Sequence, residues 1–412
     1  FIRIMKFKTL FFFPFWMVRA SSKMKITFLT FHDTICVGVR FLRAVAEEQG
    51  AETTFVTLRE QTFSLHPRKN YSKIAYETWA GGYVARSDTD VLPTDKEIRL
   101  TGDLIGMLDP DLLCISTRSY GLPMAEMIVR RAKWNFPILA GGWGPMMEPE
   151  KALKWAEHVG FGEGEQLIKL VSAFGKVEDG FRNLIYREWD KIIRNPSFRP
   201  LGEGQLNSLP FPLWNENEYV IKNDRVYKGG LFEGKTYRLL AGRGCPVGCS
   251  YCMGGQLKRL YKENYNEVMS PLRVMGVDRV LAEIKHHIGK HPETKVIRFI
   301  DELFPVKELW LDEFIEKYPK EIGDVEFDGY VRPEFHSEEH VDKLIGIGLK
   351  HCHLGIQSGS EQTRKDLYKR KHFSTSALKD FVEKLVRNGV ETKYTLMSDT
   401  PLETEDSLIE TL

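Results

Sequence analysis

The sequence predicts an α/β protein in which a doubly wound parallel sheet is followed by a partial (β/α) barrel. Two observations lead to this fold class. Short apolar segments alternate with helical patterns in two successive series, which is typical of βαβ units and parallel sheets. In the first series, glycine-rich loops directly follow two expected strands, which is where doubly wound sheets bind their ligands.

The composition bounds the possible functions. The 412 residues include 58 Lys and Arg against 57 Asp and Glu, for a net charge of +1, whereas a nucleic-acid binder is expected to be basic. The six cysteines do not form the dense framework of a small secreted protein. We therefore expect a reducing, cytoplasmic location and no nucleic-acid partner.

An apolar run over 10–18 is too short to span a membrane and contains Pro14, so residues 1–23 are expected to be an extension or disordered tail.

The first series predicts a domain over residues 24–174, with an irregular insertion at 60–94. Its expected strands are Lys25–Thr30, Glu52–Thr57, Leu112–Ser116, Pro137–Ala140 and His158–Phe161. Its expected helices are Gly38–Gln49, Asp95–Leu108, Met124–Trp134 and Pro149–Trp155. Pro- and Gly-punctuated loops then predict a linker or bridging segment over 175–235, with short strands at Asn183–Arg187 and Val226–Tyr227.

The second series predicts a domain over residues 236–412. Its expected strands are Tyr237–Ala241, Val296–Ile300, Val325–Gly329, His351–Ile356 and Thr392–Met397. Its expected helices are Arg279–His287, Lys307–Lys317, Glu338–Ile345, Thr363–Tyr368 and Thr375–Asn388. The chain stops within a sixth helical pattern without a closing strand. We expect an open or interrupted barrel, from a truncated gene product, with its chemistry at the carboxyl ends of the strands.

A cysteine motif follows the first strand of this second series. Cys245, Cys249 and Cys252 have the spacing Cys-x3-Cys-x2-Cys, and glycines at 242, 244 and 248 allow a short loop to curl so that the thiolates converge. Thiolates are the ligands of iron–sulfur clusters. Three ligands for four irons leave one iron open for a substrate or cofactor, which indicates chemistry rather than electron storage alone.

Two other interpretations of these cysteines are open. A structural zinc site needs four closed ligands, and the nearest spare candidates, His286 and His287, lie on an expected helix more than thirty residues further on. Incidental cysteines are the second alternative, which the tight spacing on a glycine-rich loop disfavours.

The segment over most of residues 236–412 resembles the radical S-adenosylmethionine (SAM) superfamily. The cysteine motif carries the resemblance, together with the aromatic Tyr251 directly before the last cysteine. The resemblance implies a [4Fe-4S] cluster on Cys245, Cys249 and Cys252. Its open iron would bind the amino and carboxylate groups of SAM, and a reducing electron would split SAM to a 5′-deoxyadenosyl radical.

Other strand ends fit this resemblance. The segment 299–304 looks like an acidic motif of the branch that also binds cobalamin, with Glu302 or Asp301 accepting the SAM amino group; a favourable helix-dipole partner is the alternative. Arg332 is a candidate for SAM ribose or carboxylate contact, or a surface residue. By the same resemblance, Gln357 and Ser358 would meet the SAM carboxylate or ribose, with Gly359 keeping the backbone close, although turn chemistry also explains these residues.

One later motif departs from the family pattern. The segment 401–406 looks like the family's Pro-Gly-Glu-Thr-Glu-Asp, but Leu402 stands at the glycine position, so no role is assigned to it. Met397 and Cys352 are expected to be core residues.

Residues 111–170 look like the Rossmann-like cobalamin-binding domain found ahead of many radical SAM domains. By that resemblance, small residues at the strand ends would approach the cobalamin tail and corrin edge: Ser116, Gly141, Gly142, Gly162 and Gly164. An Asp-x-His-x-x-Gly motif is absent, since His32 has the wrong spacing, which favours a mode of binding without a histidine ligand. A vestigial or purely structural domain is the alternative.

Together these resemblances imply a radical SAM enzyme, most readily a cobalamin-dependent methyltransferase that acts on an unactivated carbon of a small molecule. An external electron donor such as flavodoxin or ferredoxin would supply the electron. An oxidative cyclase or rearrangement enzyme on the same scaffold is one alternative, and a non-catalytic sensor that uses the cluster or cobalamin is another.

Overall fold

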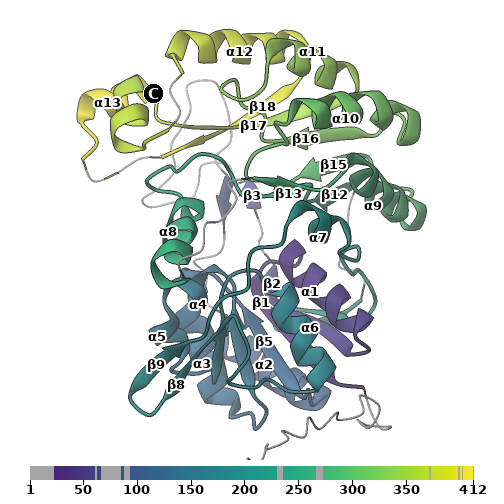
Figure 1. Cartoon of the computed structure of the whole chain (residues 1–412), viewed down its shortest axis with the longest axis vertical. Coiled ribbons are helices and arrows are strands. Elements are labelled where there is room, and N and C mark those ends of the chain that lie inside the picture. Colours follow the sequence, from purple (N-terminus) through teal and green to yellow (C-terminus); the bar gives the residue numbers. More distant parts are fainter. Residues whose placement is uncertain are drawn as a thin grey trace, which may run out of the picture.

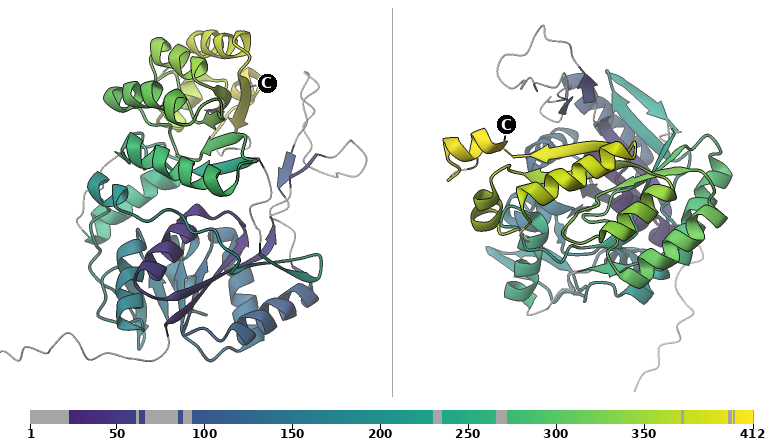
Figure 2. Two further views of the ribbon diagram at one scale, coloured as in Figure 1. Left: turned by 90° about the vertical axis from the view of Figure 1, so that its right-hand side faces the viewer. Right: turned by 90° about the horizontal axis from the view of Figure 1, so that it is seen from above.

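The computed structural model describes residues 23–60, 63–65, 85–87, 93–229, 235–265, 272–370, 373–397, 400 and 402–411. These residues form two stacked parts, each a sheet covered by helices (Figure 1, Figure 2). The expected N-terminal extension lies almost entirely outside the described residues. No helix in the described part of the chain is long and apolar enough to cross a membrane.

The first part is built on a nine-stranded sheet in the order β11-β10-β2-β1-β5-β6-β7-β8-β9. Its central strands are parallel, as expected. The strands in chain order are β1 Lys25–His32, β2 Glu52–Glu60, β5 Leu112–Ser116, β6 Ile138–Gly141, β7 His158–Gly160, β8 Leu184–Glu188, β9 Lys191–Arg194, β10 Glu218–Lys222 and β11 Arg225–Lys228.

The segment expected as a linker is part of this sheet. Strands β8 and β9 extend it beyond β7 as antiparallel neighbours, and β10 pairs in parallel with β2 at the other side. Ile185 and Ile221 are buried in the sheet core. Because each of these strands is short and interrupted by loops, the sequence alone indicated only two of the four.

Helices cover both faces of the first sheet, which makes it doubly wound (Figure 1). Helices α1 and α6 pack together on one face with Phe28 and Phe55, and α2 and α3 pack on the other with Leu29 and Val56. The helices are α1 Val37–Glu48, α2 Asp95–Leu108, α3 Leu122–Ala132, α4 Trp143–Met147, α5 Pro149–Ala152, α6 Glu165–Phe174 and α7 Glu203–Asn207.

The expected irregular insertion contains a short antiparallel hairpin, β3 Phe63–Leu65 with β4 Ala85–Ser87. Most of the rest of this insertion lies outside the described residues. Helix α2 then begins where a capping box fixes it: the Thr94 side chain accepts a hydrogen bond from the backbone N–H of Glu97, and the Glu97 carboxylate accepts one from Thr94.

The second part is a five-stranded parallel sheet in sequential order, β12-β15-β16-β17-β18. This order is that of a (β/α) barrel, and the expected fold class is confirmed. The strands are β12 Thr236–Leu239, β15 Val296–Phe299, β16 Glu326–Gly329, β17 Leu349–Gln357 and β18 Glu391–Leu396. The helices are α9 Val277–Lys290, α10 Glu308–Glu321, α11 Glu338–Gly346, α12 Thr375–Arg387 and α13 Glu405–Thr411.

Four elements of the second part differ from expectation. A small antiparallel pair, β13 Gly242–Arg243 with β14 Arg273–Val274, and helix α8, Met253–Tyr265, flank the cysteine loop. The helical turn expected at 363–368 is a π-helix over Thr363–Leu367. Single-turn π segments often occur at functional sites, and this one contacts the cysteine loop.

Candidate functional site

The cysteine loop lies between β13 and α8, directly after the first strand of the second part. Gly244 has a φ of +91°, a conformation that glycine adopts without strain. The Cys249 side chain is buried, whereas Cys245 and Cys252 are half-buried. The backbone N–H of Cys252 donates to the Cys249 carbonyl at 3.1 Å, so the last two cysteines share one tight turn.

Two neighbouring elements hold this loop. At its start, the buried Asp301 carboxylate accepts hydrogen bonds from the backbone N–H groups of Ala241, at 3.1 Å, and Gly242, at 2.6 Å. In its second half, Ser250 donates through its backbone N–H to the Tyr368 carbonyl at 3.0 Å and through its hydroxyl to the Leu367 carbonyl at 2.7 Å. The loop is therefore fixed to the end of β15 and to the π-helix.

The thiols of Cys245 and Cys249 are close enough to interact. Burial raises the pKa of the Cys245 thiol and the nearby Cys249 raises it further, while Arg332 and Lys258 act in the opposite direction. Among the described residues there is no group of three His, Cys, Asp or Glu that could hold one metal ion. This finding disfavours a single zinc ion, and it leaves the cluster assignment a prediction, because each thiolate of a cubane cluster binds a different iron.

Tyr251 projects from the loop, with 38% of its surface exposed. Its ring packs edge-to-face on Tyr368, with centroids 5.2 Å apart. Arg332 and Arg370 are close enough to affect its charge, and burial raises the pKa of its phenol.

Asp301 and Glu302, the two acidic residues after β15, differ in their surroundings. Both oxygens of Asp301 accept hydrogen bonds from the backbone at the start of the cysteine loop, so Asp301 holds the loop in place, and its expected contact with the SAM amino group stays a prediction. Glu302 is exposed and stays a candidate for that contact. Sequence reasoning could not separate the two, since adjacent carboxylates share one motif.

Arg332 belongs to a buried charged cluster. Its guanidinium pairs with Glu334, whose carboxylate also lies 3.4 Å from Arg370, and the side chains of Glu334 and Arg370 are 1% and 3% exposed. Arg370 also donates to the carbonyl of Ile356 at 3.1 Å, near the end of β17. Glu334 and Arg370 were not predicted, because no local motif marks them.

Gln357 is the last residue of β17 and Ser358 follows it, and the two residues differ in conformation and burial. Gln357 lies at a register shift with a φ of +71°, a strained conformation of the kind found at ligand sites. The Ser358 side chain is fully buried, and its hydroxyl lies 3.3 Å from Glu403 and 3.2 Å from the Thr411 hydroxyl. Ser358 therefore holds helix α13 and the segment before it, and its expected contact with SAM stays a prediction.

Gly359 also serves packing. A Cβ added to it would lie 2.0 Å from the Glu410 carbonyl oxygen, so the backbone of Gly359 packs closely against α13. Its expected approach to a ligand stays a prediction. Glu403, in the motif to which no role was assigned, is the acceptor that orients Ser358. Pro401 of that motif lies outside the described residues.

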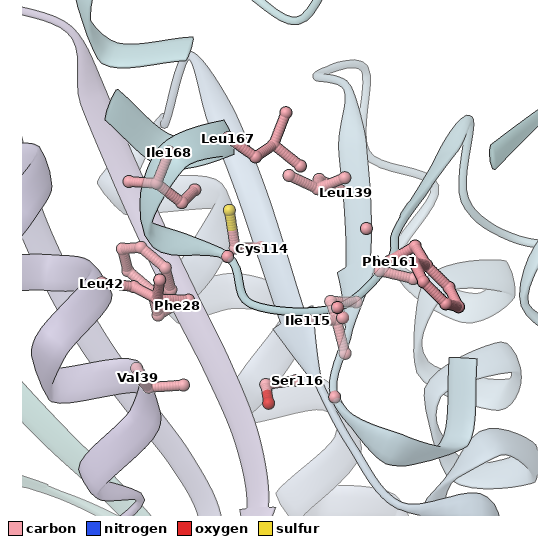
Figure 3. Close-up of a pocket in the computed structure, with 16 residues that line it drawn as sticks. Phe28, Val39, Leu42, Cys114, Ile115, Ser116, Leu139, Phe161, Leu167 and Ile168 are labelled. Carbon is pink, nitrogen blue, oxygen red and sulfur yellow. The ribbon is translucent and has the colours of Figure 1, made fainter. Parts of the chain in front are cut away.

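A separate pocket opens in the first part, between the sheet and helices α1 and α6 (Figure 3). It encloses about 540 Å³ of empty space, including space open to solvent. All five residues predicted to approach cobalamin line this pocket: Ser116, Gly141, Gly142, Gly162 and Gly164. Apolar side chains from β1, α1, β5, β6 and α6 complete it, among them Phe28, Val39, Leu139 and Leu167 (Figure 3). His32 does not line it.

The glycines of this pocket differ in what an added side chain would contact. A Cβ on Gly142, where φ is +84°, would meet the Thr117 carbonyl oxygen at 2.7 Å, and one on Gly162, where φ is +72°, would meet the Tyr261 hydroxyl at 1.9 Å. A Cβ on Gly141 would meet nothing within 4 Å. At Gly141, therefore, a side chain would extend into open space rather than clash with the protein.

The pocket loop and the cysteine loop are joined by ion pairs. Arg243 lies 2.6 Å from Glu165 and 3.4 Å from Glu163, and Arg273 lies 2.8 Å from Glu163. Burial lowers the pKa of Arg243, but the two glutamates outweigh burial and the net shift is upward. Glu163 and Glu165 were noted only as parts of a glycine-rich loop, and their partners lie too far along the chain to be inferred.

Comparisons with known proteins agree with this geometry. Residues 239–412 match the radical SAM superfamily. The structure of the radical SAM methyltransferase TsrM from Kitasatospora setae, with tryptophan substrate and a SAM analogue bound, aligns with a TM-score of 0.65 at 14% identity, covering 93% of this chain and 69% of that one. TsrM with cobalamin and a [4Fe-4S] cluster bound aligns with a TM-score of 0.64 at 14% identity, covering 93% and 68%.

A second enzyme shares the fold. The cobalamin-dependent SAM radical enzyme OxsB, with aqua-cobalamin bound, aligns with a TM-score of 0.63 at 15% identity, covering 94% of this chain and 51% of that one. No curated protein matches the chain. At these identities the structural likeness shows the fold, while the sequence match shows the superfamily of the second part. Residues 239–412 therefore match the radical SAM superfamily, and the two parts together have a fold similar to those of TsrM and OxsB.

Proposed function

We propose that this chain is a radical SAM enzyme that cleaves SAM reductively at a [4Fe-4S] cluster and uses cobalamin to methylate an unactivated carbon of a small molecule. The observation that carries the proposal is the glycine-rich loop with Cys245, Cys249 and Cys252 at the carboxyl end of the first strand of a radical SAM domain. When bound, the cluster and SAM would supply a carbon radical that abstracts hydrogen from the substrate.

The donor set fits a cluster with one open iron. Three thiols on one loop provide three of the four ligands, and the loop is held by backbone contacts to Asp301 and the π-helix rather than by the cysteines themselves. Burial raises the pKa of the Cys245 thiol, and the positive charges of Arg332 and Lys258 oppose that shift. These residues would hold the cluster in a fixed orientation, with Glu302 and Arg332 as candidates for contacts to SAM.

The pocket of the first part supports the cobalamin half of the proposal. Its lining is apolar and includes Ser116 and the four predicted glycines. It opens at the carboxyl ends of parallel strands, where doubly wound sheets bind ligands. TsrM and OxsB, which share the fold, have been solved with cobalamin bound.

The test is anaerobic reconstitution with iron, sulfide, SAM and hydroxocobalamin, read by metal stoichiometry, absorption spectra and 5′-deoxyadenosine formation under reduction. We expect Cys249→Ala to lose the cluster absorption and most of the bound iron. Cys36→Ala, at a half-buried cysteine of the first part, is the matched control and should keep both. Iron content unchanged in Cys249→Ala would refute the cluster assignment.

Two alternatives give different outcomes in the same experiment. Product analysis separates a methylated product from a cyclised or rearranged one. A protein that keeps its cluster and yet forms no 5′-deoxyadenosine under reduction would favour the sensor over the enzyme.

A further inference from the structure

The two faces of the second sheet have opposite character. Side chains alternate between the faces along each strand. Tyr237, Leu239, Ile297, Phe299 and Phe327 belong to one apolar cluster with helices α9, α10 and α11. The residues between them, Arg238, Arg298 and Asp328, therefore point to the inner face, where the chemistry of a (β/α) barrel is enclosed.

Two arginines stand side by side on this inner face. Arg238 in β12 and Arg298 in β15 are paired in register on neighbouring parallel strands. Like charges at paired positions of neighbouring strands are destabilising. A sheet that keeps two such residues without a need for both would lose stability for no gain, and exceptions of this kind concentrate at functional sites.

Of these two arginines, only Arg298 has an ion-pair partner among the described residues. The Nε of Arg298 donates to Asp328 at 2.6 Å, and that carboxylate is fully buried. The terminal NH2 groups of Arg298 make no hydrogen bond with any described residue, and the part of the chain that the structure describes offers Arg238 neither a hydrogen bond nor an ion pair. Burial and the neighbouring Arg298 lower the pKa of Arg238.

Further polar atoms around these arginines lack partners. Asp328 Oδ1 and His353 Nε2 are buried without a hydrogen bond, although that imidazole nitrogen lies 3.8 Å from the other oxygen of Asp328. The His353 ring packs on Tyr330, with centroids 5.1 Å apart. Buried polar atoms are nearly always satisfied in proteins, so this group of donors and acceptors indicates a partner other than the described residues.

The position of this group relates it to the proposed chemistry. Strand β12 leads directly into the cysteine loop. In Figure 1, β12 and β15 form the side of this sheet nearest the first part, and Asp33 at the end of β1 is close enough to affect the charge of Arg238. The inner face near Arg238 thus lies between the cysteine loop and the first part.

We propose that Arg238 and Arg298 together bind an anionic group of the substrate, a carboxylate or a phosphate, with Asp328 and His353 beside it as hydrogen-bond partners. The inference rests on the proposed function, since it names the substrate class of that same site. Guanidinium groups bind carboxylate and phosphate oxygens through paired N–H donors. Binding an anion here would relieve the repulsion between the two arginines and would supply acceptors for the guanidinium N–H groups that have none among the described residues.

The test measures anion binding to the full chain, reconstituted with iron and sulfide but not reduced, by calorimetric titration with inorganic phosphate and separately with acetate. We expect saturable binding of one of them, and the one bound more tightly distinguishes a phosphorylated substrate from a carboxylate. Arg238→Gln should weaken that binding at least tenfold, and Arg238→Lys should restore part of it. Arg225→Gln, at an exposed arginine of β11, is the control and should bind as the unmodified protein does.

Thermal unfolding keeps the test decisive. Because Arg238→Gln removes a repulsion, its melting temperature should equal or exceed that of the unmodified protein. A lowered melting temperature with unchanged anion binding would mean a structural arginine and overturn the inference, as would the absence of saturable binding or its loss in Arg332→Gln alone. If the cluster assembles and SAM is cleaved while no anion binds, the inference fails and the proposed function stands; if no cluster assembles, both fail.

Discussion

Arg243, two residues before the first cysteine of the motif, lies 2.6 Å from Glu165, the first residue of helix α6 in the other part of the molecule. Their side chains are 14% and 7% exposed. This contact places the cysteine loop directly against the loop that borders the pocket of the first part. The two candidate cofactor sites are therefore parts of one continuous structure rather than independent modules.

Removal of one partner of this pair should destabilise the protein. Arg243→Gln would leave Glu165 buried without its main counter-charge, at a cost of roughly 3 kcal/mol in the free energy of unfolding. Arg225→Gln, at an exposed position, should change that free energy by less than about 0.5 kcal/mol. Urea denaturation of the variants and the unmodified protein measures both.

The double variant tests whether the pair itself is responsible. Arg243→Gln combined with Glu165→Gln should lose clearly less than the sum of the two single losses, since the second change removes the carboxylate that the first left unpaired. Additive losses would show that the two side chains act independently.

Gly162 and Tyr261 make a second contact between the parts. Leu257 and Tyr261 of α8 belong to the core of the first part, and the Tyr261 hydroxyl occupies the position 1.9 Å from a Cβ at residue 162. Gly162→Ala should therefore lower the melting temperature through this clash, and through a positive φ that costs roughly 1–2 kcal/mol for other residues.

Tyr261→Phe separates the two causes. In the Gly162→Ala background it removes the clashing oxygen, so it should recover part of the lost stability while the cost of the backbone conformation stays. Scanning calorimetry of the four proteins measures the recovery. A double variant as unstable as Gly162→Ala, or less stable, would contradict the contact.

Gly141 offers a test of the pocket without damage to the fold. A side chain here meets open space, so Gly141→Ala and Gly141→Val should keep the free energy of unfolding within about 0.5 kcal/mol. Hydroxocobalamin binding, followed by absorbance titration, should weaken with side-chain size, at least tenfold for valine. Gly142→Val is the contrasting variant, because its Cβ would meet the Thr117 carbonyl oxygen at 2.7 Å and should destabilise the protein itself. Undiminished binding to Gly141→Val would place the ligand elsewhere.

The order of strands and helices could be predicted from the sequence because each element carries its own period of apolar residues. Strand β5 and helix α2 have the bounds expected of them. Helix α8 was missed because two glycines follow its first residue and it is rich in charge, and its burial depends on contacts with a domain more than ninety residues earlier. Local pattern contains no signal of such contacts.

The candidate site divides in the same way. The small residues expected to approach cobalamin lie together around one pocket, because position at a strand end follows from the order of the sheet, and their contact with cobalamin stays a prediction. Ser358 was assigned to a ligand because its partners, Glu403 and Thr411, lie 45 and 53 residues further along the chain. The Glu334 cluster was not found for a similar reason, since one of its arginines, Arg370, is 36 residues away.

The burial of Asp301 predicts that the stability of the protein depends on pH. Burial raises the pKa of its carboxyl from 3.8 to about 8, with a smaller contribution from Glu302, while the backbone N–H groups of Ala241 and Gly242 act against this shift. Between these two values the folded protein holds a proton at Asp301 that the unfolded chain has released. The contribution of Asp301 to the free energy of unfolding is therefore fully present below about pH 4, and it is lost as the pH rises through about 8.

Asp301→Asn isolates that dependence, because an amide has the shape of the protonated acid and does not ionise. The free energy of unfolding, measured by denaturant titration from pH 4 to pH 9, should fall with rising pH in the unmodified protein more steeply than in the variant. The difference between the two proteins should thus change continuously across this range, since titration of all other groups cancels. A constant difference would mean that Asp301 is ionised throughout, stabilised by the two N–H groups that it receives from the start of the cysteine loop.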